Sequence, residues 1–276
     1  MLMKIRRTGS HIKTCASCLV SLVLVSAIIY CGYKIVLYII DSHRTKEAAS
    51  AVEDIAQVSE VEDDENTEII DNDEPPESIY WTYMKMNLID VKFDELKKTN
   101  SDTKGWIQVK GTNINYPFVQ ASDNDYYLKH SFEKWYSDSG WVFADYRNRL
   151  DGSDKNMILY AHGRYDGTMF GTLRNALGNG WTNNPNNYVF LTSTESENAL
   201  WQVFSAYRIP TTSDYLRTEF ASDESFGEFA EMLRARSGHD FNTTVSGSDH
   251  IITLSTCYDN ESRMVLHAKL IKRSAK

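Results

Sequence analysis

His250-Ile-Ile-Thr-Leu-Ser-Thr-Cys257 and Arg263-Met-Val-Leu-His-Ala-Lys-Leu-Ile271 flank the polar run Tyr-Asp-Asn-Glu-Ser near the C-terminus. Both flanks are rich in β-branched and apolar residues, which favour strands, whereas the five residues between them favour a loop. We therefore predict two neighbouring β-strands. A cysteine ends the first strand and an arginine begins the second.

Side chains alternate between the two faces of a strand, so the second strand divides into two sets. The set that we expect in the core comprises Met264, Leu266, Ala268 and Leu270. The other set comprises Arg263, Val265, His267 and Lys269. In the first strand, Cys257 has the parity of Thr253 and Ser255, opposite to the apolar Ile252 and Leu254. This parity predicts that the thiol and the guanidinium share one side, with a potential nucleophile beside a permanent cation.

The N-terminal part of the chain is a candidate membrane anchor. Residues 1–14 are basic and contain no acid, and residues 15–40 are almost wholly apolar apart from Lys34. A helix of this length exceeds the roughly 30 Å hydrocarbon core of a bilayer, and Lys34 can extend to the interface. A cleaved signal peptide is the alternative, but its apolar region is usually about 7 to 15 residues. We predict one transmembrane helix with residues 1–14 in the cytoplasm and the rest of the chain outside.

The segment 41–78 is strongly acidic. Glu47 to Met84 contains thirteen Asp or Glu and no Lys or Arg, so the net charge of −9 belongs to this segment and the remainder is mildly basic. Repulsion among these acids, with Pro75-Pro76 near the end, predicts an extended or partly helical spacer. Neither part has the composition of a nucleic-acid-binding protein.

The four cysteines are unevenly placed. Cys15, Cys18 and Cys31 lie in the apolar segment, and no nearby His or Cys completes a metal site with the C-x-x-C pair. Cys257 is the only cysteine that we expect outside the cell. A lone exported thiol has no intrachain disulfide partner, so we expect it to be buried or used.

Residues 79–276 predict one mainly β domain. Residues 79–99 have helical spacing and predict one or two helices, and short strand signals follow at regular intervals, which favour a barrel or a sandwich. The eight predicted strands are 105–109, 113–119, 140–144, 156–161, 188–192, 199–209, 250–256 and 263–272. Two further helices are predicted, over 169–177 with Gly178 as the C-cap and over 223–236 with Ser222 as the N-cap.

A nucleophilic cysteine needs a base or a cation beside it and a donor for the oxyanion. His162 follows the apolar run 157–161 and precedes Gly163, so it is placed at a strand end. His267 lies mid-strand, where we expect a solvated face, and the other three histidines beyond residue 79 lie in polar connections. Arg263 suits an oxyanion role because its guanidinium stays charged and planar, although it could equally be a surface cation. The sequence contains no H-E-x-x-H, P-loop or G-x-S-x-G motif.

Residues 79–272 resemble the sortases, cysteine transpeptidases of Gram-positive cell surfaces, and Thr253-Leu-Ser-Thr-Cys257 has the form typical of class B. The other resembling segments are Trp106-Ile107, Ile114 to Gln120, Asp145-Tyr-Arg-Asn148, Tyr160-Ala-His162 and Met169-Phe-Gly-Thr-Leu173. Ala161 differs from the glycine usual in the family. The resemblance implies an eight-stranded sortase-type β-barrel with a few peripheral helices, behind the single transmembrane helix.

The resemblance also implies the catalytic residues, with His162 and Cys257 matching the family histidine and cysteine and Arg263 the final-strand arginine. The implied reaction cleaves a C-terminal sorting motif after Thr through a thioester and joins the protein to a peptidoglycan amine. Asn148, Ser255 and Thr256 are expected to line the substrate groove. Secreted proteins with a sorting motif and a cell-wall amine are the implied partners, and no metal or organic cofactor is implied.

Two alternatives stay open at this point. A hydrolytic cysteine peptidase on the same fold would use water as the acceptor. A non-enzymatic surface-binding module on a stalk would carry Cys257 as an incidental buried residue.

Overall fold

A computed structural model describes residues 5–70 and 74–276 of the chain, with side chains from residue 16 onward. The basic tail 1–14 and Cys15 therefore lie outside the residues whose side chains are described. The chain forms two compact units, and the division lies after Arg44, within helix α1 (Ile5–Ala56). The two units are described separately below.

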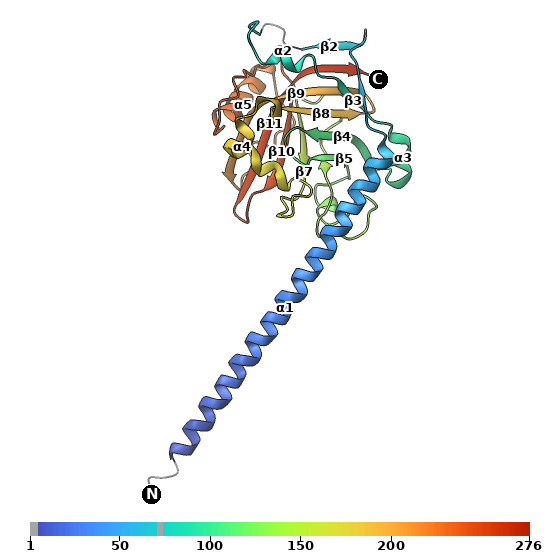
Figure 1. Cartoon of the computed structure of the whole chain (residues 1–276). Helices are drawn as coiled ribbons and strands as arrows, with labels where there is room; N and C mark the ends of the chain where they lie inside the picture. Colours follow the sequence, from blue (N-terminus) through green and yellow to red (C-terminus); the bar gives the residue numbers. More distant parts are fainter. Residues whose placement is uncertain (1–4, 71–73) are drawn as a thin grey trace. The chain divides into compact units, whose positions relative to one another are not determined.

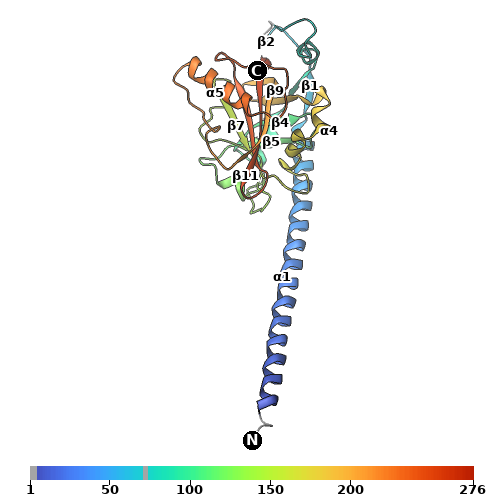
Figure 2. The same cartoon turned by 90° about the vertical axis from the view of Figure 1, so that its left-hand side faces the viewer.

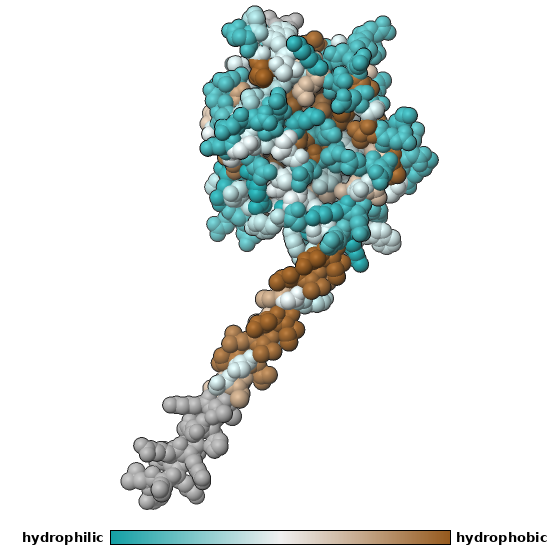
Figure 3. Space-filling model, viewed as in Figure 1, coloured by the Kyte–Doolittle hydropathy of each residue, from teal (hydrophilic) through white to brown (hydrophobic). Residues whose placement is uncertain are grey.

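The first unit is an apolar helix. From Ala16 to Ile40 its side chains are exposed, and hydrophobic residues follow one another along it (Figure 3). This part of the helix is long and apolar enough to cross a membrane.

The second unit is built on a closed β-barrel. Eight of the described strands pair in the order β10-β7-β6-β5-β4-β8-β9-β11, and pairing between β10 and β11 closes the ring (Figure 1). Their bounds are β4 (Thr103–Val109), β5 (Asn115–Val119), β6 (Phe143–Ala144), β7 (Asn156–Tyr160), β8 (Val189–Thr194), β9 (Glu197–Pro210), β10 (Ile251–Cys257) and β11 (Ser262–Ala275). All eight predicted strands are present within a few residues, and of the two predicted architectures the barrel is confirmed.

Short elements connect and cover the barrel (Figure 2). They are β1 (Ser59–Val61), β2 (Thr67–Ile69), α2 (Tyr80–Tyr83), β3 (Leu88–Asp90), α3 (Phe93–Thr99), η1 (Tyr126–Leu128), η2 (Gly171–Leu177), α4 (Asn179–Thr182) and η3 (Pro185–Asn187), with α5 (Asp223–Ala235). The helix predicted over 169–177 is a 3₁₀ helix that begins at Gly171 and has Gly178 as its C-cap. The prediction of one or two helices over 79–99 is confirmed by α2 and α3. The short strand β3 between them was not predicted, and it pairs with β1 and packs against the core.

The inner face of the barrel is the main core. Met264, Leu266, Ala268 and Leu270 all belong to it, as the alternation predicted. Phe118, without exposed surface, belongs to the same cluster. Each large apolar side chain buried in this way contributes roughly 1.5–3 kcal/mol.

A second core lies on the outer face of β9, β10 and β11, under helix α5. Phe226, Phe229 and Leu233 of α5 pack there with Val265 of β11. Helix α5 begins at the predicted N-cap, where the Ser222 side chain accepts a hydrogen bond from the Ser225 amide. The outer face of β11, which carries Val265, is therefore covered by helix α5 and is not in contact with water.

The segment 41–78, predicted to be an extended or partly helical spacer, is helical as far as Ala56 and also packs against the barrel. Val52 and Ala56 are buried, and β2 pairs with the end of β11. The buried ammonium of Lys272 lies 2.7 Å from Asp63, and Arg273 lies 2.8 Å from Glu68. The acids of this segment thus pair with cations at the end of β11, which offsets the mutual repulsion on which the prediction rested.

Candidate active site

Cys257 and Arg263 lie directly opposite each other at one end of the β10–β11 pair. The register pairs Cys257 with Arg263, and directly opposed residues of antiparallel strands point to the same face. Cys257 is exposed and ends β10, while Arg263 is half-buried and donates from Nη1 to the carbonyl of Ser262 over 3.3 Å. The thiol and the guanidinium are therefore neighbours at the rim of the barrel.

His162 reaches the same rim through the parallel pairing of β7 and β10. The last paired residues are Tyr160 and Ser255, so His162 and Cys257 each lie two residues beyond the pairing. The Thr256 hydroxyl donates to the carbonyl of Ala161 over 2.7 Å. At Gly163 a Cβ would lie 2.2 Å from the carbonyl oxygen of Cys257, so only glycine permits this close approach. The backbone around His162 thus packs against the backbone of the cysteine.

One nitrogen of the His162 ring is fixed by a backbone carbonyl. Nε2 lies 2.8 Å from the carbonyl oxygen of Leu128. A carbonyl oxygen only accepts, so Nε2 carries the hydrogen, and Nδ1 is the nitrogen left to exchange a proton. The ring is half-exposed.

Tyr215 is a neighbour of this site that the sequence did not indicate. It lies in the connection between β9 and α5, and its hydroxyl is 2.9 Å from Ser255 Oγ. Burial raises the pKa of Tyr215, which also interacts electrostatically with Arg263 and Cys257. The phenol is therefore neutral, and its hydroxyl is a buried polar group beside the end of β10. No sequence pattern marks it, because only the tertiary fold brings its loop to the end of β10.

The three residues expected to line a substrate groove are all buried. Asn148 is 5% exposed, donates to the Asn156 carbonyl and accepts from the Ile158 amide, so both ends of its side chain hold β7. Ser255 bonds Tyr215 and Thr256 bonds Ala161, as described above. These contacts support the fold around the site, and direct contact with a substrate stays a prediction.

The segment Asp145-Tyr-Arg-Asn148 contains a buried hub that holds the loops around the site. The Asp145 carboxylate accepts from the Arg147 guanidinium (2.7 Å), the Tyr160 hydroxyl (2.8 Å) and the Asn124 amide (3.0 Å). Burial by itself raises the pKa of Asp145, but the hydrogen bonds from Arg147 and Tyr160 outweigh it and hold this pKa below the usual range. The hub ties β7, two residues before His162, to the loop that carries Leu128.

A surface groove lies beside this hub. Its lining residues are Asn124, Arg147, Tyr160, Ser213, Leu216, Arg217, Thr218 and Glu219. Tyr160 pairs with Ser255, two residues before Cys257, which itself does not line the groove. The groove is a candidate seat for an extended peptide.

The expectation of a solvated His267 is wrong. Its side chain is fully buried between β11 and helix α5, and its ring nitrogens lie 2.9 Å from the hydroxyls of Tyr207 and Thr253. Burial and the nearby guanidinium of Arg236 lower the pKa of His267 to about 3, so the ring is neutral. The prediction failed because the alternation of side chains along β11 shows which residues share its outer face but not which element covers that face.

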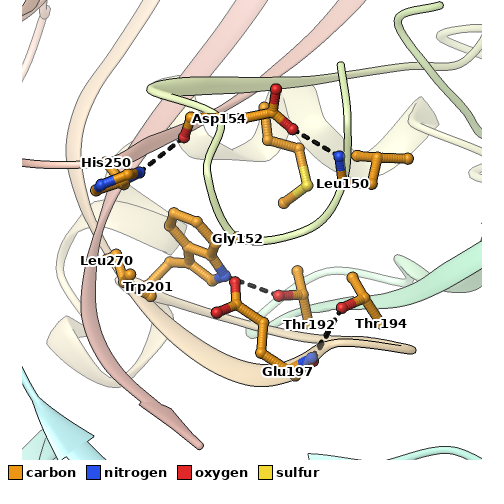
Figure 4. Close-up of a pocket in the computed structure, with 10 residues that line it drawn as sticks. Leu150, Gly152, Asp154, Thr192, Thr194, Glu197, Trp201, His250 and Leu270 are labelled. Carbon is orange, nitrogen blue, oxygen red and sulfur yellow. Dashed lines mark hydrogen bonds between the residues drawn. The ribbon is translucent and has the colours of Figure 1, made fainter. Parts of the chain in front are cut away.

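The opposite end of the barrel has a different pocket (Figure 4). His250 donates from Nδ1 to the carbonyl of Asp154 over 2.8 Å, and Glu197 and Trp201 lie nearby. Burial raises the pKa of Glu197. The residues around this pocket include no cysteine. Within the part of the chain that the structure describes, no three His, Cys, Asp or Glu side chains form a group that fits a metal ion.

Comparison with protein families decides the assignment. A family model described as the sortase domain matches residues 107–271, more than half of the chain. The chain belongs to the sortase family. This sortase is 37% identical over 187 residues to Sortase B of Listeria monocytogenes, covering 65% of the present chain and 74% of the relative.

Solved structures agree with this assignment. Sortase B of Bacillus anthracis matches with a TM-score of 0.69 and 31% identity, over 85% of the present chain and 99% of that one. A substrate complex of Staphylococcus aureus sortase B matches with a TM-score of 0.61 and 35% identity, over 65% and 84% of the two chains. The present chain is thus a class B sortase, a cysteine transpeptidase with the eight-stranded barrel of this class.

Proposed function

We propose that this sortase is anchored in the membrane and uses Cys257, His162 and Arg263 to join secreted proteins to a cell-wall amine. The observation that carries the proposal is the pairing of exposed Cys257 opposite Arg263, beside the His162 backbone. A nucleophile, a proton carrier and a fixed cation at one rim are the groups that acyl transfer requires.

In the first half-reaction, the Cys257 sulfur attacks the Thr carbonyl carbon of a sorting motif near the C-terminus of the substrate. The thiol proton passes to Nδ1 of His162, and the carbonyl oxygen becomes an oxyanion held by Arg263. The tetrahedral intermediate collapses to a thioester as the C–N bond of the Thr-Gly or Thr-Asn type bond breaks. The leaving nitrogen receives the proton from His162.

In the second half-reaction, an amine of a peptidoglycan precursor attacks the thioester. His162 removes a proton from this nitrogen and returns it to the departing sulfur, so Cys257 is regenerated and a new amide bond forms. The hydrogen bond from Nε2 to Leu128 supports this role, because it keeps the same ring orientation in both halves.

The groove beside Tyr160 is the proposed seat of the motif. The solved complex of the Staphylococcus aureus relative with its substrate supports a peptide substrate of this kind. The apolar helix is the proposed anchor, with the basic tail 1–14 in the cytoplasm and the barrel outside. The acidic segment that follows is proposed to join the anchor to the catalytic domain.

The test is product analysis of the full chain in detergent micelles. Peptides with Thr-Gly and Thr-Asn bonds are incubated with and without triglycine. The proposal predicts cleavage after Thr and, with triglycine, a product extended by the acceptor. Cleavage that yields only the free acid at all acceptor concentrations would favour a hydrolytic peptidase. Absence of cleavage, together with an unreactive Cys257 thiol, would favour a binding module.

A further inference from the structure

Tyr258, the residue after Cys257, has two guanidinium groups close to its ring. The Cζ atom of Arg208 is 4.3 Å from the centre of its ring, and that of Arg174 is 5.7 Å away. Both distances fall within the range of cation–π attraction. The two arginines come from separate parts of the fold, since Arg208 lies in β9 and Arg174 in η2.

Arg174 connects this ring to the loop that carries His162. Its Nη2 donates to the carbonyl of Gly163 and its Nε to the carbonyl of Gly171, each over 3.0 Å. The same guanidinium also lies 4.9 Å from the exposed ring of Tyr165. One planar group thus binds the residue after the histidine through a hydrogen bond and faces the residue after the cysteine.

Arg208 is itself held in place beside the same ring by hydrogen bonds. Its Nε donates to the Ser262 hydroxyl over 2.8 Å, and its Nη2 lies 2.5 Å from Asp259. The Tyr258 amide donates to the carbonyl of Ser262 over 3.0 Å, which closes the loop that leads to Arg263. Arg208 therefore binds the turn between β10 and β11 to β9, and Arg174 adds a further contact to the same turn.

We propose that the stack of Arg174, Tyr258 and Arg208 sets the distance between the Cys257 sulfur and His162, with Arg174 as the positioning residue. The proposal rests on the proposed roles of Cys257 and His162. The pairing of β7 with β10 ends at Tyr160 and Ser255, so His162 and Cys257 are not joined by this ladder. Beyond it, the Thr256 hydrogen bond to Ala161 and the packing at Gly163 hold the two segments together, and the Arg174 hydrogen bond to Gly163 adds to them. A guanidinium suits this task because it donates in its plane while presenting its face to a ring, which an ammonium does not do.

Arg174 and Arg208 belong to neither core, and Tyr258 is half-exposed and packs only against the edge of the main core. Removal of the stack should therefore alter geometry more than stability. A shift of about 1 Å in reacting groups can lower a rate by roughly 100-fold, so even a small displacement of the histidine loop is measurable.

The experiment compares Arg174→Ala, Arg174→Lys, Tyr258→Ala, Tyr258→Phe and the double alanine variant, with Arg234→Ala on the surface of α5 as the matched control. Two readouts are used in the full chain. One is kcat and KM for peptide transfer, and the other is the pH profile of Cys257 alkylation by iodoacetamide, followed on the Cys257 peptide by mass spectrometry because other thiols are present.

The expected result is a kcat roughly 10-fold to 100-fold lower in both alanine variants and in Arg174→Lys, with KM within about twofold. The alkylation profile should shift in the same three variants. Tyr258→Phe and Arg234→Ala should match the wild type, because the ring face is kept in one and the stack is untouched in the other. The double variant should be no slower than the slower single variant, since both substitutions remove the same contact between Arg174 and Tyr258.

Unchanged kcat in Arg174→Ala, strictly additive losses, or losses that follow the thermal midpoint would overturn the proposal. Failure of the proposed function is separately visible, because the wild type itself would then form no transfer product. The alkylation profiles of the variants would in that case still show whether the stack affects the reactivity of Cys257.

Discussion

The parallel pair of β7 and β10 has a histidine at each end, but the two ends differ in the groups that lie beside it. At one end His162 is held by the carbonyl of Leu128, and at the other His250 is held by the carbonyl of Asp154. The first end also has an exposed thiol opposite a guanidinium, whereas at the second end His250 lines a pocket whose residues include no cysteine and no arginine. A histidine that is hydrogen-bonded to a backbone carbonyl is therefore not enough to identify an active site. The nucleophile and the cation beside it make the difference.

Removing the nucleophile should have the largest effect. Cys257→Ala is expected to lower the transfer rate by a factor on the order of 10⁴ or more, because no other group forms the thioester. The exposed thiol contributes little to the cores, so the thermal midpoint should stay close to that of the wild type. Peptide transfer and a thermal scan check both points, with Cys31→Ala as the control thiol. Appreciable transfer by Cys257→Ala would contradict the account.

The two histidines test the comparison next. His162→Asn is expected to lower kcat by roughly 10²- to 10⁴-fold, since an amide cannot move the proton to the leaving nitrogen. His250→Asn should change kcat by no more than about twofold. Steady-state kinetics on both variants measure this difference. Equal losses in the two variants would mean that the barrel ends do not differ in the way proposed.

The arginines at the two ends of β11 extend the comparison. Arg263→Lys should lower kcat by roughly 10²-fold, because one fixed donor to the oxyanion is lost while the positive charge is kept. Arg273→Lys, at the far end beside Glu68, should leave kcat within about twofold. Initial rates at saturating peptide give the comparison. If Arg263→Lys keeps full activity, charge alone is sufficient and the planar donor has no role.

The buried His267 predicts a smaller effect, on stability. Its folded pKa of about 3 lies below the usual 6.5, so the unfolded chain binds one proton more between these values. The stability that this group contributes is therefore present above pH 6.5 and is lost as the pH falls, by on the order of 1.4 kcal/mol per pH unit. Urea unfolding of wild type and His267→Gln from pH 7.5 to 4.5 tests this. The two curves should converge as the pH falls, and parallel curves would exclude the buried neutral ring.

Much of the barrel was predictable because its signals are local. Alternation placed Met264 and Leu266 inside, and the Ser222 cap marked the start of α5. The prediction for His267 failed because the outcome depends on what packs against the strand, and the ring lies under α5 instead of in water. The charge pattern likewise did not show that acids of the segment 41–78 pair with cations of β11 such as Lys272.

The site divides in the same way. Strand parity by itself predicted Cys257 beside Arg263, and the register bears this out. The position of His162 at a strand end indicated a cleft, and the family resemblance named it. Leu128 and Tyr215 were not predicted, because they reach the site from loops whose paths depend on the whole fold. Asn148 was expected to line the substrate groove, which stays a prediction, and the structure shows that its side chain hydrogen-bonds to the backbone of β7.

The most direct test of the central claim is trapping of the acyl-enzyme. The full chain is mixed with a sorting-motif peptide in the absence of an amine and quenched in acid, and its intact mass and the Cys257 peptide are measured. The account predicts a mass increase equal to the motif through Thr, located on Cys257, which disappears when triglycine is added and does not form in Cys257→Ala. Peptide cleavage with no adduct under any quench time, or an adduct on another residue, would contradict it.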